Sequence, residues 1–334
     1  MNKGETLHAK NRADHAPLVS IIMPVCNAGP YVAEAVSSML EQSMGDFEFL
    51  IVDDASDDNS ADIVASFDDS RIVLLHNAER MGVAASLNRM LDLARGEFIA
   101  RMDADDISLP ERLAIQVDFM RKHSDIWACG GKDEVFSDSR PLVQIREAYP
   151  DHEEIKAVLL FYNPISHPFM IYRGSVWREH GIRYSLDAPY AEDYELWSRL
   201  THHLPGAKMA NIQTVLGRWR RRSSSVSAQH KERQLGSALA IQMRNLRALG
   251  FSVTDAGLAV HAKFFSRRQP ASCVEDLQAV FAWAIRLLEA NRERAIYEQA
   301  VLKRLLFQQL LWVVERDARF SRQGKELLAS WNKA

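Results

Sequence analysis

Cysteine and long apolar runs are scarce in this sequence, and both scarcities exclude classes of protein. Only three of its 334 residues are cysteine. Cys26, Cys129 and Cys273 show neither metal-site spacing nor a pairing pattern, so we expect buried, reduced thiols in a reducing compartment. No apolar run approaches the ~20 residues that span a bilayer, and the polar first sixteen residues lack the apolar core of a signal peptide. We therefore expect a soluble, cytoplasmic protein.

An excess of positive charge is also missing. The chain carries 41 lysines and arginines against 44 aspartates and glutamates, a net charge of −3. Nucleic-acid-binding proteins more usually carry a positive excess, so no nucleic-acid partner is expected. The basic run Arg218–Arg222, with Trp219 as a stacking platform for bases, is the one feature that points the other way. A pocket for phosphate groups needs only such a local cluster.

The first third of the sequence contains alternating strand and helix patterns. Short apolar runs predict strands, and apolar residues at helical spacing predict the helices between them. The strands are expected at 18–25, 47–52, 71–75 and 98–102, and the helices at 30–40, 60–67 and 82–94. This order predicts a largely parallel sheet with right-handed crossovers, whose strands end at one shared edge.

Carboxylates gather where two of these strands end. Asp53 and Asp54 follow the second strand, and Asp103, Asp105 and Asp106 follow the fourth. Three carboxylates within four residues repel one another unless a positive charge lies among them. Oxygen ligands in the crevice at the ends of parallel strands suit a hard divalent cation that clamps a diphosphate. We expect these side chains to converge on one cleft; a solvated acidic loop is the alternative.

Four segments together resemble the family 2 glycosyltransferases. They are Val19–Asn27, Ile51–Asp57, Ala94–Asp106 and Glu192–Trp197, in the order and spacing of that family. The resemblance covers residues 17–227 and implies the GT-A fold, an α/β architecture with a mostly parallel, Rossmann-like sheet flanked by helices. It also implies transfer of a sugar from a nucleotide diphosphate with inversion of configuration.

The resemblance assigns roles in donor binding to matching residues. Asp54 matches the residue that hydrogen-bonds the nucleotide base, and Pro24 and Val25 match the wall beneath that base. Asp103 and Asp105 match the DxD motif, whose carboxylates hold the ribose and a Mn²⁺ or Mg²⁺ ion.

A second group of matches concerns catalysis and the diphosphate. Asp193 matches the catalytic base of the family's Glu-Asp motif, and a carboxylate is the simplest acceptor for the proton of an attacking hydroxyl. Helix capping is its alternative role, because a helix is predicted at 194–201. The segment Trp219–Ser227 resembles the family stretch near the diphosphate, so Arg220 and Arg222 are expected to bind phosphate oxygens.

Some positions depart from the family pattern, and others add candidates. Cysteine, alanine, tryptophan and arginine replace the usual tyrosine, glycine, tyrosine and histidine at Cys26, Ala55, Trp219 and Arg222. A guanidinium cannot coordinate a cation, so Arg222 removes metal ligation from its loop. Further candidate site residues are Asp53, Asp106, Glu192 and His167. A hydrogen-bonded structural role is the alternative for His167, which lies in the segment Asn163–Pro168.

The last third of the sequence is helical in pattern and has no strand signals. We expect a polar tail at 1–16, a catalytic domain at 17–227 and a helical region at 228–334. Apolar stripes are expected in two of its helices: Leu235, Leu239, Met243, Leu246 and Leu249, and then Val274, Leu277, Phe281, Ile285 and Leu288. The helix at 301–314 has a broad apolar surface with interleaved basic residues. It could lie at the inner face of the cell membrane, or pack against the catalytic domain or a partner.

The expected function is that of a metal-dependent hexosyl- or N-acetylhexosaminyl-transferase. The resemblance implies a UDP-sugar donor, a glycan or lipid-linked glycan acceptor, and a place in bacterial surface polysaccharide or lipopolysaccharide synthesis. A non-catalytic sugar-nucleotide-binding module is the alternative; it would keep Asp54 but would not need Asp105 or Asp193, and both are present. A phosphorylation receiver would carry its acidic pair after the first strand, and a nucleotidyltransferase would need a glycine-rich loop that residues 26–29 lack.

Overall fold

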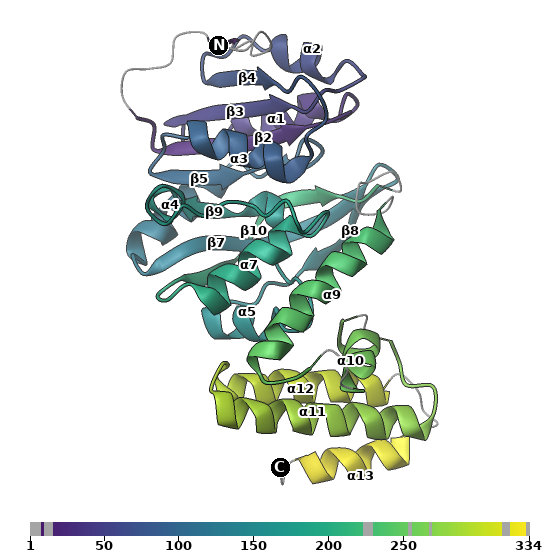
Figure 1. Cartoon of the computed structure of the whole chain (residues 1–334). Coiled ribbons are helices and arrows are strands. Elements are labelled where there is room, and N and C mark those ends of the chain that lie inside the picture. Colours follow the sequence, from purple (N-terminus) through teal and green to yellow (C-terminus); the bar gives the residue numbers. More distant parts are fainter. Residues whose placement is uncertain are drawn as a thin grey trace.

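A ten-stranded sheet forms one end of the molecule, and helices alone form the other (Figure 1). The computed structural model describes residues 8–9, 16–222, 230–252, 256–266, 269–315 and 321–331. Most of the tail expected at 1–16, and the serine-rich segment 223–227, lie outside these residues. Two residues of that tail form the short strand β1 (His8–Ala9), which pairs antiparallel with β4.

The first half of the sheet has the predicted parallel arrangement. Its elements are β2 (Val19–Val25), α1 (Val32–Leu40), β3 (Phe47–Asp53), α2 (Ser60–Ala65), β4 (Ile72–His76), α3 (Val83–Leu93) and β5 (Phe98–Arg101). Strands β4, β3, β2 and β5 lie side by side in this order, and each neighbouring pair is parallel. The carboxyl ends of these four strands therefore share one edge, as the sequence predicts. Helix α2 begins at Ser60, as the sequence predicts, and ends at Ala65, two residues before the predicted end.

The second half of the sheet is mixed. Its elements are β6 (Ile107–Ser108), α4 (Arg112–Lys122), β7 (Ile126–Ser137), β8 (Arg140–Arg146), α5 (His152–Val158), the short 3-10 helix η1 (His167–Phe169), β9 (Ile171–Arg173), α6 (Gly174–His180), α7 (Glu192–His203) and β10 (Lys208–Arg220). Strand β9 runs antiparallel between β5 and β7, and β10 pairs parallel with β7. The two-residue strand β6, directly after the acidic turn, pairs with β10. The late strand β10 therefore lies next to residues that follow β5.

Both faces of the sheet are buried, which explains the continuous apolar strands. In β2, Ile21 and Met23 point into one core layer with α1 and α4, whereas Ile22 points into the other with α3 and α7. Parallel strands covered by helices on both faces need apolar side chains at successive positions, because neighbouring residues point to opposite faces. The helices on either side fix the sheet edge at which the candidate site lies.

The described part of the chain after Arg220 contains helices and no strand. These are α9 (Lys231–Ala248), α10 (Gly257–Val260), the π-helical turn η2 (His261–Ser266), α11 (Val274–Arg294), α12 (Gln299–Glu315) and α13 (Ser321–Trp331). The stripe expected in α11 is largely confirmed, since Leu277, Phe281 and Leu288 are buried. We refer to residues 230–331 as the helical region and to residues 16–222 as the sheet region.

The stripe expected in α9 is partly wrong. Leu246 and Leu249 are buried, but the other three expected residues are only half-buried. The buried face of α9 instead carries amides. Gln242 donates to the carbonyl oxygen of Phe161 at 2.7 Å, and Asn245 donates to that of Leu159 at 3.3 Å. A search for apolar periodicity overlooks such a face, because its buried positions are polar and hydrogen-bonded.

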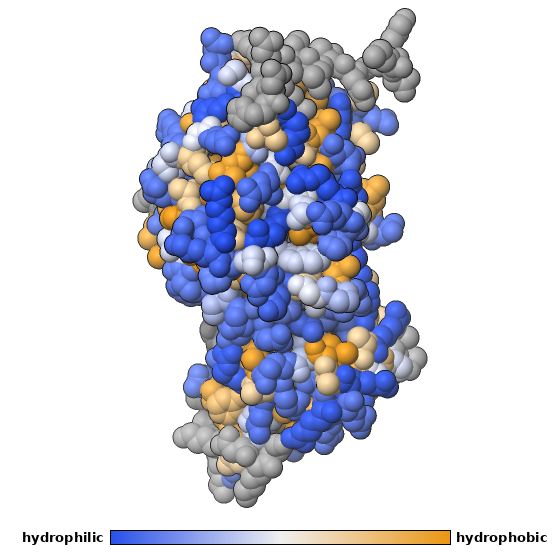
Figure 2. Space-filling model, turned by 90° about the vertical axis from the view of Figure 1, so that its left-hand side faces the viewer, coloured by the Kyte–Doolittle hydropathy of each residue, from blue (hydrophilic) through white to orange (hydrophobic). Residues whose placement is uncertain are grey.

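The apolar surface of the helix predicted at 301–314 is used inside the protein. Leu302, Leu306, Leu310 and Val313 of α12 are fully buried in one cluster with α11 and with residues 157–161 of the sheet region. Packing against the protein was one of the two alternatives for this helix. The other alternative, burial of this surface in a membrane interface, is wrong for these four side chains. Among the described residues, no helix combines the length and apolar character that crossing a bilayer requires. Figure 2 shows only small, separate hydrophobic patches on one face of the molecule.

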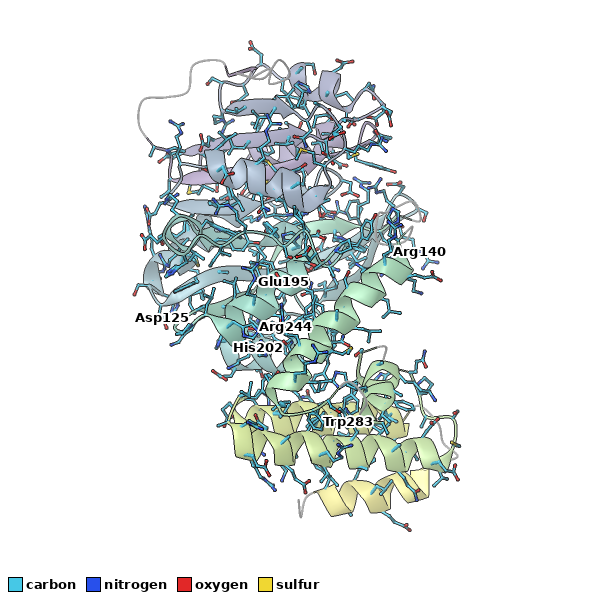
Figure 3. The ribbon with its side chains drawn as sticks, in the orientation of Figure 1. Asp125, Arg140, Glu195, His202, Arg244 and Trp283 are labelled. Atoms are coloured by element: carbon cyan, nitrogen blue, oxygen red, sulfur yellow. The ribbon has the colours of Figure 1, made fainter. Side chains whose placement is uncertain are left out.

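Polar contacts also join the helical region to the sheet region. Glu195 of α7 and Arg244 of α9 face each other, with an Oε1 to Nη1 distance of 2.9 Å (Figure 3). At the far end of α7, His202 Nε2 lies 2.9 Å from the Tyr297 hydroxyl. A cavity of about 200 Å³, lined mainly by aromatic side chains of 149–162 with Phe265 and Trp312, lies between the two regions.

Candidate active site

An acidic turn follows β5 and forms the core of the candidate site. Oxygen atoms of Asp103, Asp105 and Asp106 lie within 4.8 Å of one another. Asp106 is buried; its Oδ1 accepts a 2.8 Å hydrogen bond from the main-chain N–H of Arg220, and its Oδ2 has no partner among the described residues. Burial, and then the charges of Asp105 and Asp103, raise the pKa of Asp106 well above its usual range. Burial and Asp103 likewise raise the pKa of Asp105.

This turn fits a divalent cation. Three carboxylates supply the hard oxygen ligands that Mn²⁺ and Mg²⁺ take in proteins. A buried carboxylate oxygen without a hydrogen-bond partner is costly unless another group, such as a cation, satisfies it. A bound cation would also favour the ionised forms that burial and mutual repulsion disfavour.

Two arginines from the end of β10 lie against the acidic turn, in different ways. The Arg220 side chain is only 7% exposed and is fully engaged: Nε donates to the Asp105 carbonyl oxygen at 2.9 Å, Nη1 pairs with Asp138 at 2.6 Å, and Nη2 pairs with Glu34. These contacts hold the acidic turn in place. They also use the donors of the Arg220 guanidinium, which leaves few for the diphosphate contact that the sequence predicts. Arg222 pairs with the Asp105 carboxylate, and its guanidinium lies 4.8 Å from the centre of the Tyr31 ring.

The acidic pair at the end of β3 has two distinct environments. Asp54 Oδ1 accepts hydrogen bonds from Asn77 Nδ2 at 2.6 Å and from the main-chain N–H of Met81 at 2.9 Å, while Oδ2 accepts from Gly82 at 2.8 Å. Asp53 is also buried, but its Oδ1 has no partner among the described residues. Both carboxylate oxygens of Asp54, the predicted base-binding residue, therefore accept hydrogen bonds from the protein itself. One oxygen of Asp53, in contrast, has no partner among the described residues.

The strand order brings the two acidic groups to the same edge. Strand β2 lies between β3 and β5, so its end, at Pro24 and Val25, separates Asp53 from the acidic turn. Val25 is buried, Pro24 is half-buried, and the Val25 carbonyl accepts the Asp54 N–H at 2.7 Å. The predicted convergence is thus confirmed at the level of the sheet edge. Among the residues that the structure describes, the group that could hold a cation consists of the three aspartates of the turn, and neither Asp53 nor Asp54 belongs to it.

Asp193 and Glu192 form a second carboxylate pair, in the first turn of α7. The N-cap residue of this helix is Ala191, so the alternative of Asp193 as the cap is wrong. Asp193 Oδ2 accepts a 2.7 Å hydrogen bond from Asn163 Nδ2, and Oδ1 accepts one from the Tyr194 N–H at 2.7 Å. Burial raises the pKa of Asp193; burial, followed by the charge of Asp193, raises the pKa of Glu192 to about 7.

The surroundings of His167 fit the hydrogen-bonded structural role that is its alternative. Its ring is buried, Nε2 lies 2.8 Å from the Tyr184 hydroxyl, and its edge contacts Trp197 at a centroid distance of 5.7 Å. Burial, and then the charge of Arg101, hold the pKa of His167 well below its usual range. Burial and a lowered pKa are typical of a neutral, hydrogen-bonded histidine inside a protein.

The sequence patterns do not predict two residues that lie near the site. Asn163 is the first residue of the segment Asn163–Pro168, and its side chain donates to Asp193. Arg101 is the last residue of β5; its buried guanidinium places Nη1 2.5 Å from Asp103 Oδ2. A signal for Arg101 was present, because a charged residue interrupts the otherwise apolar run 98–102.

Comparisons of the sequence with known proteins agree with this arrangement. The family model "Glycosyl transferase family 2" matches residues 20–180. An uncharacterized glycosyltransferase of Haemophilus influenzae is 31% identical over 244 residues, which cover 70% of this chain and 74% of that protein. The putative glycosyltransferase EpsE of Bacillus subtilis is 34% identical over 204 residues, covering 60% and 72%. The Escherichia coli protein WfgD, named as a UDP-Glc:alpha-D-GlcNAc-diphosphoundecaprenol beta-1,3-glucosyltransferase, is 43% identical over 107 residues, covering 32% and 42%.

Solved structures share the fold at low sequence identity. Residues 1–349 of S. aureus TarS in complex with UDP-GlcNAc align with a TM-score of 0.56 and 18% identity, covering 94% of this chain and 91% of that one. The mannosyltransferase PcManGT of Pyrobaculum calidifontis, in complex with GDP-Man and Mn²⁺, aligns with a TM-score of 0.54 and 17% identity, covering 96% and 87%. These alignments establish a common GT-A architecture that includes the helices after the sheet.

Proposed function

This chain belongs to glycosyl transferase family 2, and from that premise we propose that it is a metal-dependent, inverting enzyme that moves a sugar from a UDP-sugar to a glycan or lipid-linked glycan. One observation carries the proposal. A three-aspartate turn able to hold a cation and a separately held carboxylate, Asp193, are both present, and each has protein groups that fix its geometry.

The proposed reaction is a single displacement at the anomeric carbon of the donor. The acceptor hydroxyl oxygen forms the new bond to that carbon as the bond to the diphosphate oxygen breaks, and the hydroxyl proton passes to Asp193. Asn163 and the Tyr194 N–H each occupy one carboxylate oxygen of Asp193, which fixes the direction of its remaining lone pairs. Attack from the face opposite the leaving group inverts the configuration.

The leaving diphosphate requires positive charge. Asp103, Asp105 and Asp106 are the residues that would hold Mn²⁺ or Mg²⁺, which would neutralise the charge that develops on the diphosphate. Arg222 is the arginine we assign to the phosphate oxygens, because Arg220 is engaged by Glu34, Asp138 and the turn. In the proposed complex, a phosphate oxygen of the donor replaces the Asp105 carboxylate as the partner of Arg222. This change of partner gives Arg222 a charge-assisted contact with the donor.

The identities of donor and acceptor are inferred by analogy. UDP and UDP-GlcNAc occupy the TarS structures, and WfgD is named for a glucosyl transfer to a diphosphoundecaprenol-linked sugar. We therefore favour UDP-hexose or UDP-N-acetylhexosamine, and a lipid-linked acceptor reached from the cytoplasmic face of the membrane in surface polysaccharide synthesis. The end of β2 and the acidic pair Asp53 and Asp54 would form the base site, with the unused oxygen of Asp53 as an acceptor for a base N–H.

A panel of nucleotide sugars tests the proposal. Thermal stability is measured with UDP-, GDP- and dTDP-sugars, each with Mn²⁺ and with a chelator, because a ligand of the native state raises the unfolding temperature. We expect a UDP-sugar to stabilise the protein only with the cation, and Asp105→Asn to abolish this response. The control Asp118→Asn removes an exposed carboxylate of α4, paired with Lys122, and should respond as wild type does.

An assay of sugar transfer then distinguishes an enzyme from a binding module. With the stabilising donor and a diphosphoprenol-linked monosaccharide, we expect release of nucleoside diphosphate together with extension of the acceptor. Donor binding equal with and without the cation would contradict the metal role. Cation-dependent binding without turnover on any glycan acceptor would favour the non-catalytic sugar-nucleotide-binding alternative.

A further inference from the structure

We propose that Tyr190 is a positioning residue for Asp193, a role that rests on the proposed function in which Asp193 accepts the proton of the acceptor. Tyr190 lies three residues before Asp193, in the turn that leads into α7. Helix α9 holds the ring and the carbonyl oxygen of Tyr190, and this contact fixes the point at which α7 begins. Through it, the helical region takes part in the active site of the sheet region.

Tyr190 has a backbone conformation that bulky residues rarely adopt. Its φ is 63°, in the left-handed region, which is unfavourable for any residue with a Cβ atom. Tyr190 is the third residue of a four-residue turn, 188–191, in which the last N–H donates to the first carbonyl oxygen at 3.1 Å. Pro189 precedes it, and proline followed by a positive φ is the pattern of a type II turn, whose third residue is normally glycine. A tyrosine persists at such a position only where surrounding contacts hold it there.

Three contacts with the start of α9 hold this turn. The Tyr190 ring stacks on the ring of His230, the residue before α9, with centroids 4.3 Å apart and an interplanar angle of 11°. Gln234 Nε2 donates to the Tyr190 carbonyl oxygen at 2.9 Å. Ser237 Oγ donates to the Pro189 carbonyl oxygen at 3.0 Å. Gln234 and Ser237 lie three positions apart and therefore on one face of α9, so both the backbone and the side chain of the turn are fixed against the same helix.

The turn leads directly into the helix that carries Asp193. Helix α7 begins at Glu192 after the N-cap residue Ala191, whose methyl side chain cannot accept a hydrogen bond from the free N–H groups of the first turn. The Ala191 carbonyl oxygen accepts the Glu195 N–H at 2.9 Å. Because a side-chain cap is missing, the contacts of residues 188–191 set the place of this helix end. A shift of the turn therefore displaces the Asp193 carboxylate.

Helix α9 also holds the residues on the other side of Asp193. Helices α7 and α9 lie side by side (Figure 1). Asn163, which donates to Asp193 at 2.7 Å, closely follows the segment 159–161. Carbonyl oxygens of that segment accept hydrogen bonds from the buried amides of Gln242 at 2.7 Å and Asn245 at 3.3 Å, both on α9. One helix therefore fixes both the turn before the proposed base and the segment that leads to its hydrogen-bond donor. A general base needs such fixed geometry, because it must lie within hydrogen-bond reach of the proton that it accepts.

Steady-state kinetics of sugar transfer test this role. Tyr190→Ala and Gln234→Ala should each lower kcat by about tenfold or more, because a small misplacement of a catalytic group slows the reaction. Their affinity for nucleoside diphosphate with Mn²⁺ should equal that of wild type. Tyr190→Phe keeps the ring and should retain most of the wild-type kcat. Gln213→Ala is the matched control: it removes a hydrogen bond of 3.0 Å from an exposed glutamine of β10 to the Ala148 carbonyl oxygen and should leave kcat unchanged.

Tyr190→Gly separates the ring from the backbone conformation. Glycine adopts a positive φ without strain, so Tyr190→Gly should unfold at a higher urea midpoint than Tyr190→Ala. It has no ring to stack on His230, so its kcat should be as low as that of Tyr190→Ala. A wild-type kcat in Tyr190→Gly would show that the ring does not position Asp193 and would overturn the proposal.

A double-mutant cycle shows whether the effect passes through Asp193. If α9 acts by placing this carboxylate, Gln234→Ala should lower the kcat of wild type but not the residual kcat of Asp193→Asn. A general loss of structure would lower kcat by the same factor in both backgrounds. Equal factors would therefore overturn the proposal.

Amide hydrogen exchange gives a readout that needs no activity. In Gln234→Ala, residues 188–196 should exchange faster than in wild type or Gln213→Ala, because the turn has lost one of its contacts with α9. If wild type transfers no sugar, the proposed function fails, and hydrogen exchange still tests whether α9 fixes the start of α7. Unchanged exchange in Gln234→Ala would overturn the proposal, as would a wild-type kcat in this variant. If Tyr190→Ala does not fold, these two measurements on Gln234→Ala decide.

Discussion

At the scale of single residues, the carboxylates of the site outnumber the arginines that pair with them. Five carboxylates, three in the acidic turn and two on α7, lie near two arginines, Arg101 and Arg222. Arg220 does not alter this balance, because Glu34 and Asp138 already neutralise it. A divalent cation is the simplest addition that would bring the site closer to neutrality.

Asp193→Asn is predicted to remove most of the transfer and leave the fold intact. The amide keeps the size of the side chain but cannot accept the acceptor proton, and a lost general base costs about 10²–10⁴ in rate. Affinity for nucleoside diphosphate with Mn²⁺, measured by calorimetry, should change little. A variant that turns over at a near wild-type rate would contradict the role of Asp193 as base. A variant that fails to fold would indicate a structural role.

Arg222→Ala is predicted to weaken binding of nucleoside diphosphate far more than binding of the free nucleoside. A charge-assisted hydrogen bond contributes ~1.5–3 kcal/mol, so the loss should be about tenfold or more. Arg221→Ala is the matched control, because Arg221 is exposed and adjacent. Equal diphosphate affinity in Arg222→Ala and Arg221→Ala would remove the phosphate role. A mobility-shift assay at low and moderate salt would reveal any RNA or DNA binding by this basic segment.

Residue roles were predictable where they depend on local sequence and not where they depend on tertiary contacts. The three carboxylates of the turn are adjacent in the sequence, and the structure brings them together as expected. The sequence does not predict that Arg220 and Arg222 have different roles. Arg220 pairs with Glu34 and Asp138, and these residues lie 186 and 82 positions away from it in the sequence. Arg101 was overlooked because a single charge in a strand has no periodic pattern.

At the scale of elements, the loop before α3 depends on a carboxylate from another strand. Asp54, beyond the end of β3, accepts the main-chain N–H groups of Met81 and Gly82 just before α3 begins at Val83. Gly82 has a φ of 88°, which suits glycine and few other residues. The carboxylate therefore joins the end of one strand to the start of a helix.

Asp54→Ala is predicted to lower the free energy of unfolding by about 1–3 kcal/mol, because it removes three hydrogen bonds, one of them from the buried Asn77 side chain. Urea denaturation measures this difference. Asp57→Ala is the control, since the Asp57 side chain is 80% exposed and should change stability by no more than about 0.5 kcal/mol. Equal midpoints for the two variants would contradict the fastening role of Asp54.

Elements with a strong apolar pattern were predicted well, and those with polar buried faces were not. The strands and helices from β2 to β5 begin and end within two residues of expectation, because both sheet faces are apolar. In α9, the buried Gln242 and Asn245 bind main-chain carbonyls just after α5, a contact that only the tertiary structure reveals. His167 is a similar case. The sequence does not show that its ring contacts the Tyr184 hydroxyl, so the sequence alone does not distinguish a structural histidine from a site residue.

At the scale of the whole molecule, the helical region and the sheet region share one hydrophobic cluster. Ala157, Val158, Leu160 and Phe161 pack in the same cluster as α11 and α12, and Arg304 of α12 pairs with Glu154 of α5. The sequence predicts a boundary between these regions at residue 227, and we propose that this boundary marks a change of architecture within one cooperative unit. The apolar stripe predicts that one face of α12 is buried. It does not predict which element of the protein packs against that face.

Leu306→Ala is predicted to lower stability by about 2–5 kcal/mol, the usual cost of truncating a fully buried leucine. We expect one unfolding transition in wild type and in the variant, with loss of donor binding at the same temperature. Leu142→Ala is the control. Leu142 lies in β8 and is 53% exposed, so its truncation should change stability little. Two separate transitions would show that the regions unfold independently.

The hydrogen bond from the Arg220 N–H to Asp106 has a consequence for synthesis of the protein. The two residues are 114 positions apart, so at ~5–20 residues per second a ribosome needs roughly 6–23 s to produce the second after the first. During that interval the emerging chain carries the whole acidic motif but not the strand that shapes it. The acidic turn therefore acquires its final shape late in translation, and a chain interrupted before β10 would retain the motif without the Arg220 contacts that hold it.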